Sequence, residues 1–467
     1  MTGLAEQVLG IDVGGSAVKV WDAGPEGVRT RSAALPVLRP GPHRVEFDPE
    51  DWWRRIAAEL RAHVADAPPG RYAGLVVSSM RQAFVLVGDD GEIGAGVLNS
   101  DRRGAGALDR LREVPAVYEV TRHWLAPELT LPKLLAIAAR EPDRWARTRR
   151  MLFVHDWLVW RLTGEQVTEV SYACAGQLAD VARRGWATDL LTGLGLDTAR
   201  LAPLVEPGTP VGTVRADDLG VPVGLPVHAG CGDTQLAAAG AGGLRDGVVT
   251  VVAGSSTPVQ AATREPALDA GQRPWVSTHA RADLWAAETN AGYPGMMAGW
   301  LRGVVGEVRR SGRPGAGGLT AVTATPHWTE HHWAVKAPVT MLGLSPAITP
   351  GDLAQAMDEA HAYAVRANIT DLHEALGRGS TEVVVTGGGA RSLAPLLADV
   401  LGRPVDVCPD ADGTATAGRA LVSGEPPAVP ALRPVAPSLG PEPYQTAYQR
   451  YLDAHDALRT HLPEEDQ

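Results

Sequence analysis

The sequence predicts an α/β protein of two large domains, because of its length and because glycine-rich turns follow several apolar strands. At 467 residues the chain exceeds what one hydrophobic core usually serves. Its 45% hydrophobic and 21% charged residues are ordinary for a globular protein. Glycine turns occur in order in the segments DVGG, GCGDTQ and TGGGARS. One such turn is weak support, whereas three in order favour an α/β protein that binds a nucleotide.

Composition argues against several kinds of partner. The formal net charge of −11 disfavours a nucleic-acid or anionic-membrane surface. No apolar run reaches membrane-spanning length, and the first ten residues do not resemble a signal peptide. We therefore expect a cytoplasmic protein with neither nucleic acid nor membrane as a partner. The cysteines Cys174, Cys231 and Cys408 contain no C-x-x-C pair, which argues against a disulfide framework or a thiolate metal site.

The segment VLGIDVGGSAVKVWDAG predicts a strand, a glycine turn and a second strand. Residues 8–13 form the first expected strand, and Gly14, Gly15 and Ser16 form the turn. Because no helix follows, the segment is neither a Rossmann nor a P-loop site. Backbone N–H groups of the turn could hold phosphate oxygens, and Asp12 would suit a hydrated Mg²⁺. An ordinary hairpin with a solvent-facing Asp12 is an equal alternative.

The segment TEVVVTGGGARSLAPLLADVLGRPVDV predicts a strand that enters a helix through glycines. We expect strands over residues 382–385 and 405–407, a turn over 387–389 and a helix over 392–401. A nucleotide is well placed on such a turn and helix N-terminus. The segment VVTVVAGSSTPVQ predicts a further pair of strands joined by a turn over residues 254–257.

Asp233 is the one charged residue in HAGCGDTQLAAAGAG. A lone ionised carboxylate among small residues is costly to bury without a partner. One interpretation makes Asp233 the N-cap of a helix that starts near Thr234. The other makes it a catalytic base on a glycine-flanked turn.

Together with these turns, several longer segments make the chain similar to the FGGY family of carbohydrate kinases, within the superfamily of sugar kinases, actin and chaperone ATPases. The segments are EFDPEDWWRRI, GLVVSSMRQAFVLVGDDGE, VLNSDRR, ELTLPKLLAIAARE, HDWLVWRLTGEQVTEVSYACAGQLAD and PYQTAYQRYLDAHDAL. The layout is most similar to the xylulokinase-like branch. The resemblance implies two actin-like, ribonuclease H-like α/β domains, residues 1–242 and 243–467, around a central cleft. It also implies ATP-dependent phosphorylation of a sugar or polyol, with a ketopentose such as xylulose as the leading candidate.

The resemblance assigns roles to individual residues. Asp233 becomes the catalytic base, and Asp12 (through water) and Asp233 become the Mg²⁺ contacts. The residues expected to bind ATP are Asp12, Gly14, Gly15, Ser16, Lys19, Gly254, Ser255, Ser256, Thr257, Gly387, Gly388, Gly389 and Ala390. The residues expected to contact the sugar are Met80, Arg81, Gln82, Asp101, Thr234 and Gln235. For Asp101 a structural ion pair is an equal alternative.

Some features differ from the family pattern. Gly15 stands where a threonine is usual, and Asp358 stands where an aliphatic residue is usual. We expect the segment HWTEHHW, residues 327–333, to be a loop rather than a metal site, because it lacks a third clear ligand. The alternative function is a sensor or pseudokinase that binds nucleotide and sugar without turnover. A homodimer is expected from the family alone.

Overall fold

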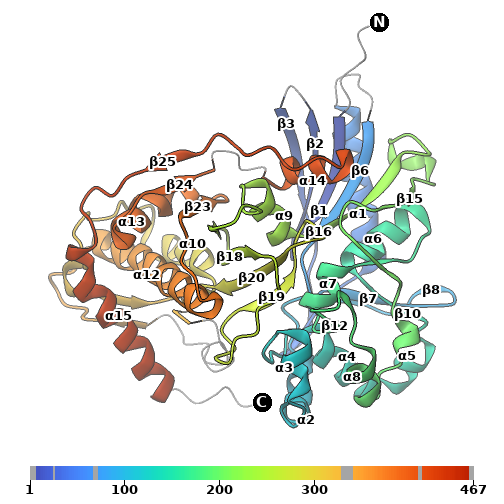
Figure 1. Cartoon of the computed structure of the whole chain (residues 1–467), viewed down its shortest axis with the longest axis horizontal. Helices are drawn as coiled ribbons and strands as arrows, with labels where there is room; N and C mark the ends of the chain where they lie inside the picture. The colour runs from blue at the N-terminus through green and yellow to red at the C-terminus, as the bar shows by residue number, and fades with distance from the viewer. Residues whose placement is uncertain are drawn as a thin grey trace, which may run out of the picture.

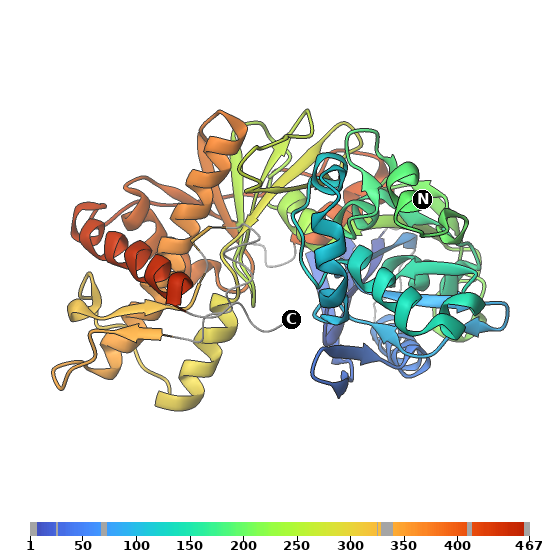
Figure 2. The same cartoon turned by 90° about the horizontal axis from the view of Figure 1, so that it is seen from below.

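The computed structural model describes residues 7–24, 27–66, 72–324, 326–327, 340–408 and 413–461. These residues form two halves, each built on a twisted mixed sheet with helices packed against it (Figure 1). Viewed from below, the half coloured blue to green and the half coloured yellow to red lie side by side (Figure 2). This arrangement confirms the predicted α/β fold class.

The N-terminal sheet has the strand order β15-β16-β6-β1-β2-β3. Its strands are β1 Gln7–Val13, β2 Ala17–Gly24, β3 Gly27–Ala34, β6 Tyr72–Ser79, β15 Pro210–Thr213 and β16 Pro226–Gly232. Strands β1, β6 and β16 run parallel, while β2 lies antiparallel to β1. The carboxyl ends of the three parallel strands therefore meet at one edge, where ligands of open α/β sheets bind.

The C-terminal sheet has the order β19-β20-β18-β17-β23-β24-β25. Its strands are β17 Val248–Val252, β18 Pro258–Thr263, β19 Trp275–Thr278, β20 Trp285–Asn290, β23 Glu382–Thr386, β24 Val405–Val407 and β25 Arg433–Val435. Strand β17 pairs antiparallel with β18 and parallel with β23, as β1 pairs with β2 and β6. The second sheet thus repeats the pairing scheme of the first, although the sequence shows no short-period repeat.

Shorter strands and helices complete both halves. A second N-terminal sheet contains β4 Leu38–Gly41, β5 Arg44–Phe47, β7 Phe84–Gly88, β8 Gly91–Glu92, β9 Gly96–Val97 and β10 Arg150–Phe153. Two-stranded sheets pair β11 Thr168–Glu169 with β14 Leu204–Val205, β12 Ala179–Asp180 with β13 Gly185–Trp186, and β21 Thr320–Val322 with β22 Thr340–Leu342. The N-terminal helices are α1 Pro49–Ala65, α2 Leu108–Arg112, α3 Ala116–Thr121, α4 Thr130–Arg140, α5 Pro142–Arg147, α6 Val154–Thr163, α7 Val170–Ala175, α8 Thr188–Gly193 and α9 Asp233–Gly240. The later helices are α10 Pro294–Val305, α12 Pro350–Leu376, α13 Ala390–Leu401, α14 Gly413–Ser423 and α15 Glu442–His461.

The longest helix, α12, shows how local sequence sets these boundaries. Thr349 accepts a hydrogen bond from the Asp352 N–H, and the Asp352 carboxylate accepts one from the Thr349 N–H, which forms a capping box. Pro350 suits the first helical position because its missing N–H would be unpaired there in any case. Gly377, with φ of 63°, ends the helix in the left-handed conformation that glycine adopts at little cost.

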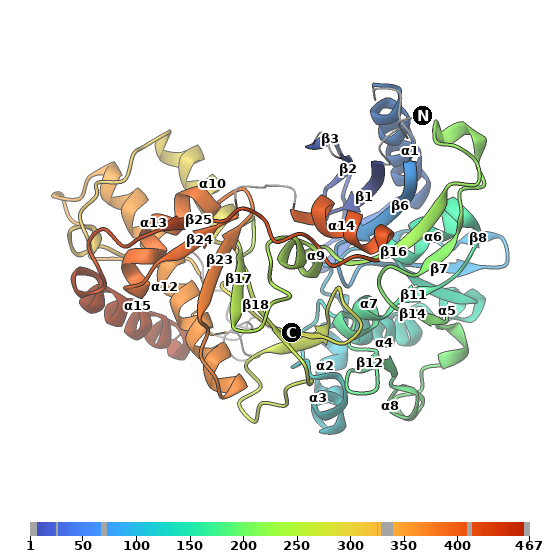
Figure 3. The same cartoon turned by 45° about the horizontal axis from the view of Figure 1, so that its top comes forward.

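Helix α14 belongs to the C-terminal part of the chain under the expected division at residue 242. It follows β24 in sequence but packs beside β1, β2 and β6 of the N-terminal sheet (Figure 3). Ala415 of α14 belongs to a buried cluster with Val8, Trp21 and Val76. The N-terminal sheet is therefore completed by a helix from the C-terminal part of the chain.

Helices α9 and α14 cross at very short range. A Cβ atom added at Gly240, the last residue of α9, would lie 1.8 Å from the Gly413 carbonyl oxygen. We expect Gly240→Ala to destabilise the protein by about 1–3 kcal/mol, because backbone must move to relieve this overlap. Thermal melting would measure the change.

Gly193→Ala is the matched control, since Gly193 is the last residue of α8 and a Cβ there meets nothing within 4 Å. It should be neutral or stabilising by up to about 1 kcal/mol. Equal melting temperatures for the two variants would show that the crossing tolerates a side chain.

Candidate active site

The parallel strands of the N-terminal sheet bring three predicted residues to one edge. Asp12 lies near the end of β1, Arg81 follows β6, and Asp233 follows β16. In the ladder Asp12 pairs with Ser78 of β6, and Gly232 pairs with Ser79. Residues distant in sequence therefore meet because neighbouring parallel strands end together.

Asp12 is a half-buried carboxylate whose hydrogen-bond partner is Ser78. The Ser78 hydroxyl donates to Asp12 Oδ1 at 2.7 Å. Burial, followed by repulsion from the Asp233 carboxylate, raises the pKa of Asp12 to about 6. Lys19 stands opposite Asp12 in the β1–β2 ladder, and its charge offsets part of this repulsion. The proximity of Asp12 to Asp233 and Lys19 does not fit the solvent-facing alternative.

Asp233 is the first residue of α9, and Gly232 holds the N-cap position. Asp233 Oδ1 accepts from the Thr234 N–H at 2.7 Å and lies 3.1 Å from the Thr234 hydroxyl. Gly232 has no capping side chain, so the N-cap interpretation of Asp233 is wrong in its geometry. Burial raises the pKa of Asp233, and the nearby Arg81 guanidinium opposes that rise.

Arg81 forms an ion pair with Glu288 that links the two halves of the molecule. The Arg81 Nη1 and Nη2 atoms donate to the two Glu288 carboxylate oxygens at 3.0 and 2.8 Å. Glu288 lies on β20 of the C-terminal sheet and also accepts from Gln260 of β18. Sequence reasoning missed Glu288 and Gln260, although the carboxylate in the segment WAAETN was an available signal.

Met80, another predicted sugar contact, lies beside the first glycine turn. Met80 is buried, and a Cβ at Gly15 would lie 4.0 Å from its sulfur and 3.6 Å from Asn99 Oδ1. The tip of the first glycine turn therefore lies beside the Met80–Gln82 loop and Asn99, which sequence reasoning did not select.

Gln82 has a φ of 68°, and its carbonyl oxygen accepts from Lys133 Nζ at 3.0 Å. The same ammonium donates to the Leu98 carbonyl oxygen at 2.9 Å. Lys133 is fully buried and joins the loop after β6 to the loop that carries Asn99. Sequence reasoning gave this lysine no role.

Asp101 is the clearest departure from the expected sugar contacts. It is fully buried, and its Oδ1 accepts from the Arg103 N–H and Nε at 3.0 and 2.8 Å. Its Oδ2 accepts from the Val45 N–H and from Arg103 Nη2. With both oxygens engaged in structural bonds, Asp101 fits the ion-pair alternative rather than a sugar contact.

Thr234 and Gln235 lie in the first turn of α9. Thr234 is half-buried and bonded to Asp233. Gln235 is fully buried, and neither its Oε1 nor its Nε2 has a hydrogen-bond partner among the described residues. Its Oε1 lies against Gly232, whose other close neighbour is the Arg81 side chain. Gln235 thus lies at the edge that carries the predicted base.

The structure brings two predicted nucleotide turns to one cavity of about 470 Å³ in the C-terminal half. Its lining includes Gly254, Ser255, Gly388, Gly389, Asp358 and His361. Helix α13 starts at Ala390, two residues earlier than expected, so its N-terminus lies directly on the glycine turn. The aspartate that departs from the family pattern, Asp358, also faces this cavity and lies 3.5 Å from Arg310.

Not every residue that the sequence predicts to bind ATP lines this cavity. Ser256 is half-buried and its carbonyl accepts from the Gly254 N–H. Thr257 is fully buried, and its hydroxyl lies 2.9 Å from His361 Nε2. Gly387 has a φ of 90° and serves the sharp turn. At the first turn, Gly14 is half-buried, whereas Gly15 and Ser16 are exposed.

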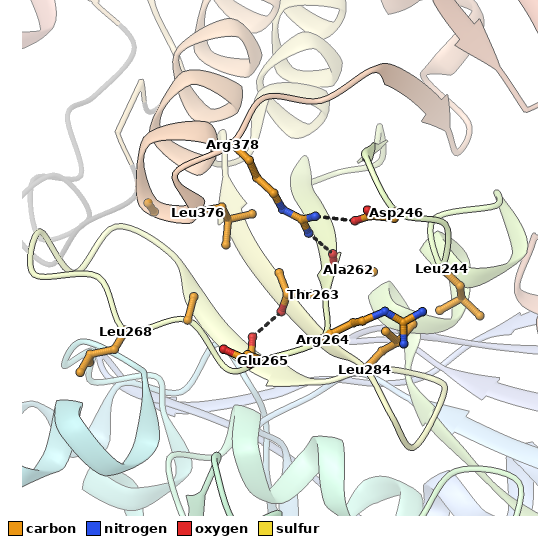
Figure 4. A pocket seen from close by; sticks show the side chains of 12 residues that line it. Leu244, Asp246, Ala262, Thr263, Arg264, Glu265, Leu268, Leu284, Leu376 and Arg378 are labelled. Atoms are coloured by element: carbon orange, nitrogen blue, oxygen red, sulfur yellow. Dashed lines mark hydrogen bonds and ion pairs between the residues drawn. The ribbon is translucent and has the colours of Figure 1, made fainter.

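A second cavity, of about 460 Å³, lies at the opposite edge of the C-terminal sheet (Figure 4). It adjoins the start of β17 and the end of β18, whereas Gly254 follows the end of β17. Its Arg378 pairs with Asp246 and donates to the Ala262 carbonyl at 3.1 Å. These contacts pair the Arg378 guanidinium within the cavity wall, and none of the predicted site residues lines this cavity.

Within the part of the chain that the structure describes, no cluster of three metal-ligating side chains occurs. His327 pairs with Asp371 at 2.9 Å, while residues 328–333 of the predicted loop lie outside the described residues. Across those same described residues, no helix is long and apolar enough to cross a membrane.

Sequence comparison identifies the family. The N-terminal domain model of the FGGY family of carbohydrate kinases matches residues 7–240, and its C-terminal domain model matches residues 249–424. YoaC of Bacillus subtilis (strain 168) is 29% identical over 254 residues, which are 54% of this chain and 52% of that protein. An autoinducer-2 kinase of Yersinia pseudotuberculosis is 26% identical over 416 residues, covering 82% of this chain and 78% of the kinase.

Solved structures show the same fold over nearly the whole chain. A xylulose kinase from Brucella ovis superposes with a TM-score of 0.85 at 25% identity, covering 97% of this chain and 100% of that one. A gluconate kinase from Lactobacillus acidophilus gives a TM-score of 0.87 at 16% identity, covering 98% and 99%. With both domain models matched, the chain belongs to the FGGY family of carbohydrate kinases, ATP-dependent enzymes that phosphorylate an alcohol group of a carbohydrate.

Proposed function

We propose that this kinase phosphorylates a neutral polyhydroxylated carbohydrate, such as a ketopentose, with Asp233 as the catalytic base. The Arg81–Glu288 pair carries the substrate part of the proposal. Because Glu288 binds the Arg81 fork through both oxygens, the guanidinium presents no uncompensated positive charge to a sugar. Asp12 and Asp233 add negative charge at the same edge. A sugar acid would meet repulsion there, whereas hydroxyl groups can donate to the carboxylates.

The names of related proteins leave several substrates open. Xylulose kinase and gluconate kinase structures superpose about equally well, and the sequence relatives include autoinducer-2 kinases. These names alone do not assign the xylulokinase-like branch. The charge balance at Arg81 and Glu288 favours the neutral class over an aldonate. A homodimer stays a prediction, which light scattering would test.

In the proposed reaction, the oxygen of the substrate hydroxyl attacks the γ-phosphorus of ATP. An Asp233 carboxylate oxygen accepts the proton of that hydroxyl at the same time. The new O–P bond forms as the bond between the γ-phosphorus and the bridging oxygen breaks, and ADP leaves. In this proposal Arg81 and Gln235, whose amide has no hydrogen-bond partner among the described residues, would orient the substrate. Gly254, Ser255, Gly388 and Gly389 would hold the nucleotide in the C-terminal cavity.

The residues present fit a Mg²⁺ ion. Asp12 and Asp233 bring two carboxylates to the same strand edge, and a cation held there would relieve the repulsion that Asp233 exerts on Asp12. The lack of a three-ligand cluster among the described residues suits an ion that keeps several waters. When bound, Mg²⁺ supplies charge neutralisation for the phosphates. Asp12 and Asp233 would hold it, Asp12 through water.

Asp233→Asn tests the base. The amide oxygen of the substituted side chain can still accept from the Thr234 N–H, so folding and ATP affinity should stay close to the parent. Sugar-dependent ADP release should fall by roughly 10²–10⁴-fold, because an amide cannot take the proton. Asp189→Asn, at an exposed acidic residue in the first turn of α8, is the matched control and should keep parental turnover.

Near-parental turnover of Asp233→Asn would refute the base assignment. Sugar binding without sugar-dependent ADP release by the parent would support the sensor alternative instead.

Matched substrates test the charge argument. D-glucitol and D-gluconate share a carbon chain and differ in an alcohol or a carboxylate at C1, as do xylitol and xylonate. Within each pair, kcat/KM should be higher for the neutral compound than for the acid. D-xylulose should likewise give a higher kcat/KM than either acid. Glu288→Gln should shift each ratio toward the acid, because it removes the charge that balances Arg81. A parental preference for gluconate, or ratios unmoved by Glu288→Gln, would contradict the proposal.

A further inference from the structure

The strand that ends at the predicted base contains a β-bulge. In the β6–β16 ladder, Val77 pairs with Ala229 and Ser79 pairs with Gly232, so β16 has one residue more than β6 over this stretch. A Cβ atom at Gly230 would lie 2.0 Å from the Val77 carbonyl oxygen, so the bulge requires glycine at that position. Bulges next to active sites redirect the side chains that follow them, and Asp233 follows this one directly.

The hydroxyl of Tyr172, on α7, occupies the gap that the bulge opens in the ladder. The Ser79 N–H donates to the Tyr172 hydroxyl oxygen at 2.9 Å, and the hydroxyl donates to the Cys231 carbonyl oxygen at 2.8 Å. One side-chain group thereby replaces the missing backbone bond between the two strands. Tyr172 is fully buried and stacks on His155 with ring centroids 4.8 Å apart. Burial raises the pKa of Tyr172 well above its usual range, so the hydroxyl keeps its proton.

The neighbouring residue of α7 holds the other side of the bulge. The Gly232 N–H donates to Ser171 Oγ at 3.0 Å, and the Ser171 hydroxyl is bonded to the Glu169 carboxylate. Ser171 and Glu169 are fully buried. The two residues before Asp233 are therefore both tied to α7 through buried hydrogen bonds.

We propose that Tyr172 is a positioning residue for phosphoryl transfer, whose hydroxyl fixes the bulge that aims Asp233. Ser79 immediately precedes Met80 and Arg81, and Cys231 lies two residues before Asp233. One hydroxyl therefore ties the strand end that carries the sugar-binding arginine to the strand end that carries the base. Without it, the two ends would lose this link across a stretch of ladder that the bulge has already interrupted. This inference rests on the proposed role of Asp233.

Tyr172→Phe tests the proposal, with Tyr451→Phe as the matched control. Tyr451 is also fully buried and donates its hydroxyl to a backbone carbonyl, that of Ala324, but it lies on α15. Both variants should melt at lower temperature than the parent. Tyr172→Phe alone should lose about 10–100-fold in kcat, because small misplacements of a reacting group cost that much, while KM for ATP stays close to parental.

A double-mutant cycle with Asp233→Asn separates positioning from general damage. If Tyr172 acts through Asp233, adding Tyr172→Phe to Asp233→Asn should cause little further loss of kcat. Parental kcat in Tyr172→Phe, or losses that multiply in the double variant, would overturn the proposal. Should Tyr172→Phe not fold, Ser171→Ala takes its place in the same cycle, with the same expected and overturning results. If Asp233→Asn itself keeps parental turnover, the proposed function fails, whatever Tyr172→Phe shows.

Discussion

The burial of two carboxylates, Asp12 and Asp233, at neighbouring strand ends is the constraint around which the N-terminal edge is arranged. Both lie at the ends of parallel strands, where burial and proximity make two negative charges costly. The hydroxyl of Ser78, the ammonium of Lys19 and the guanidinium of Arg81 each offset part of that cost. Such an edge favours ligands that bring positive charge or hydrogen-bond donors. The hydroxyl groups of a carbohydrate are such donors.

Local sequence was sufficient to predict the elements that carry this edge. The apolar run of residues 8–13, the glycine turn and the alternation of residues 18–21 predicted the hairpin now seen as β1 and β2. The glycines of residues 387–389 predicted the turn between β23 and α13. These predictions succeeded because the side-chain period and the turn residues act within a few positions of one another. Only the ends moved, with α13 starting two residues earlier than expected.

Partnerships between distant segments could not be predicted in this way. Arg81 and Glu288 are 207 residues apart, and the local sequence around each residue does not indicate its partner. Thr257 looked like a phosphate ligand, yet His361 on α12 binds its hydroxyl. Asp101 lies in a segment that resembles the family, but Arg103 and the Val45 N–H use its oxygens. In each case tertiary packing decided the outcome.

The placement of α14 has a consequence for how the chain folds as it leaves the ribosome. Strand β16 ends at Gly232, whereas α14 ends at Ser423. At roughly 5–20 residues per second, synthesis of the intervening stretch takes on the order of 10–40 s. During that interval the nascent N-terminal sheet has its strands but lacks the helix that covers Val8, Trp21 and Val76. The apolar face around Trp21 stays open to chaperones, or to neighbouring chains, until about nine-tenths of the protein has been made.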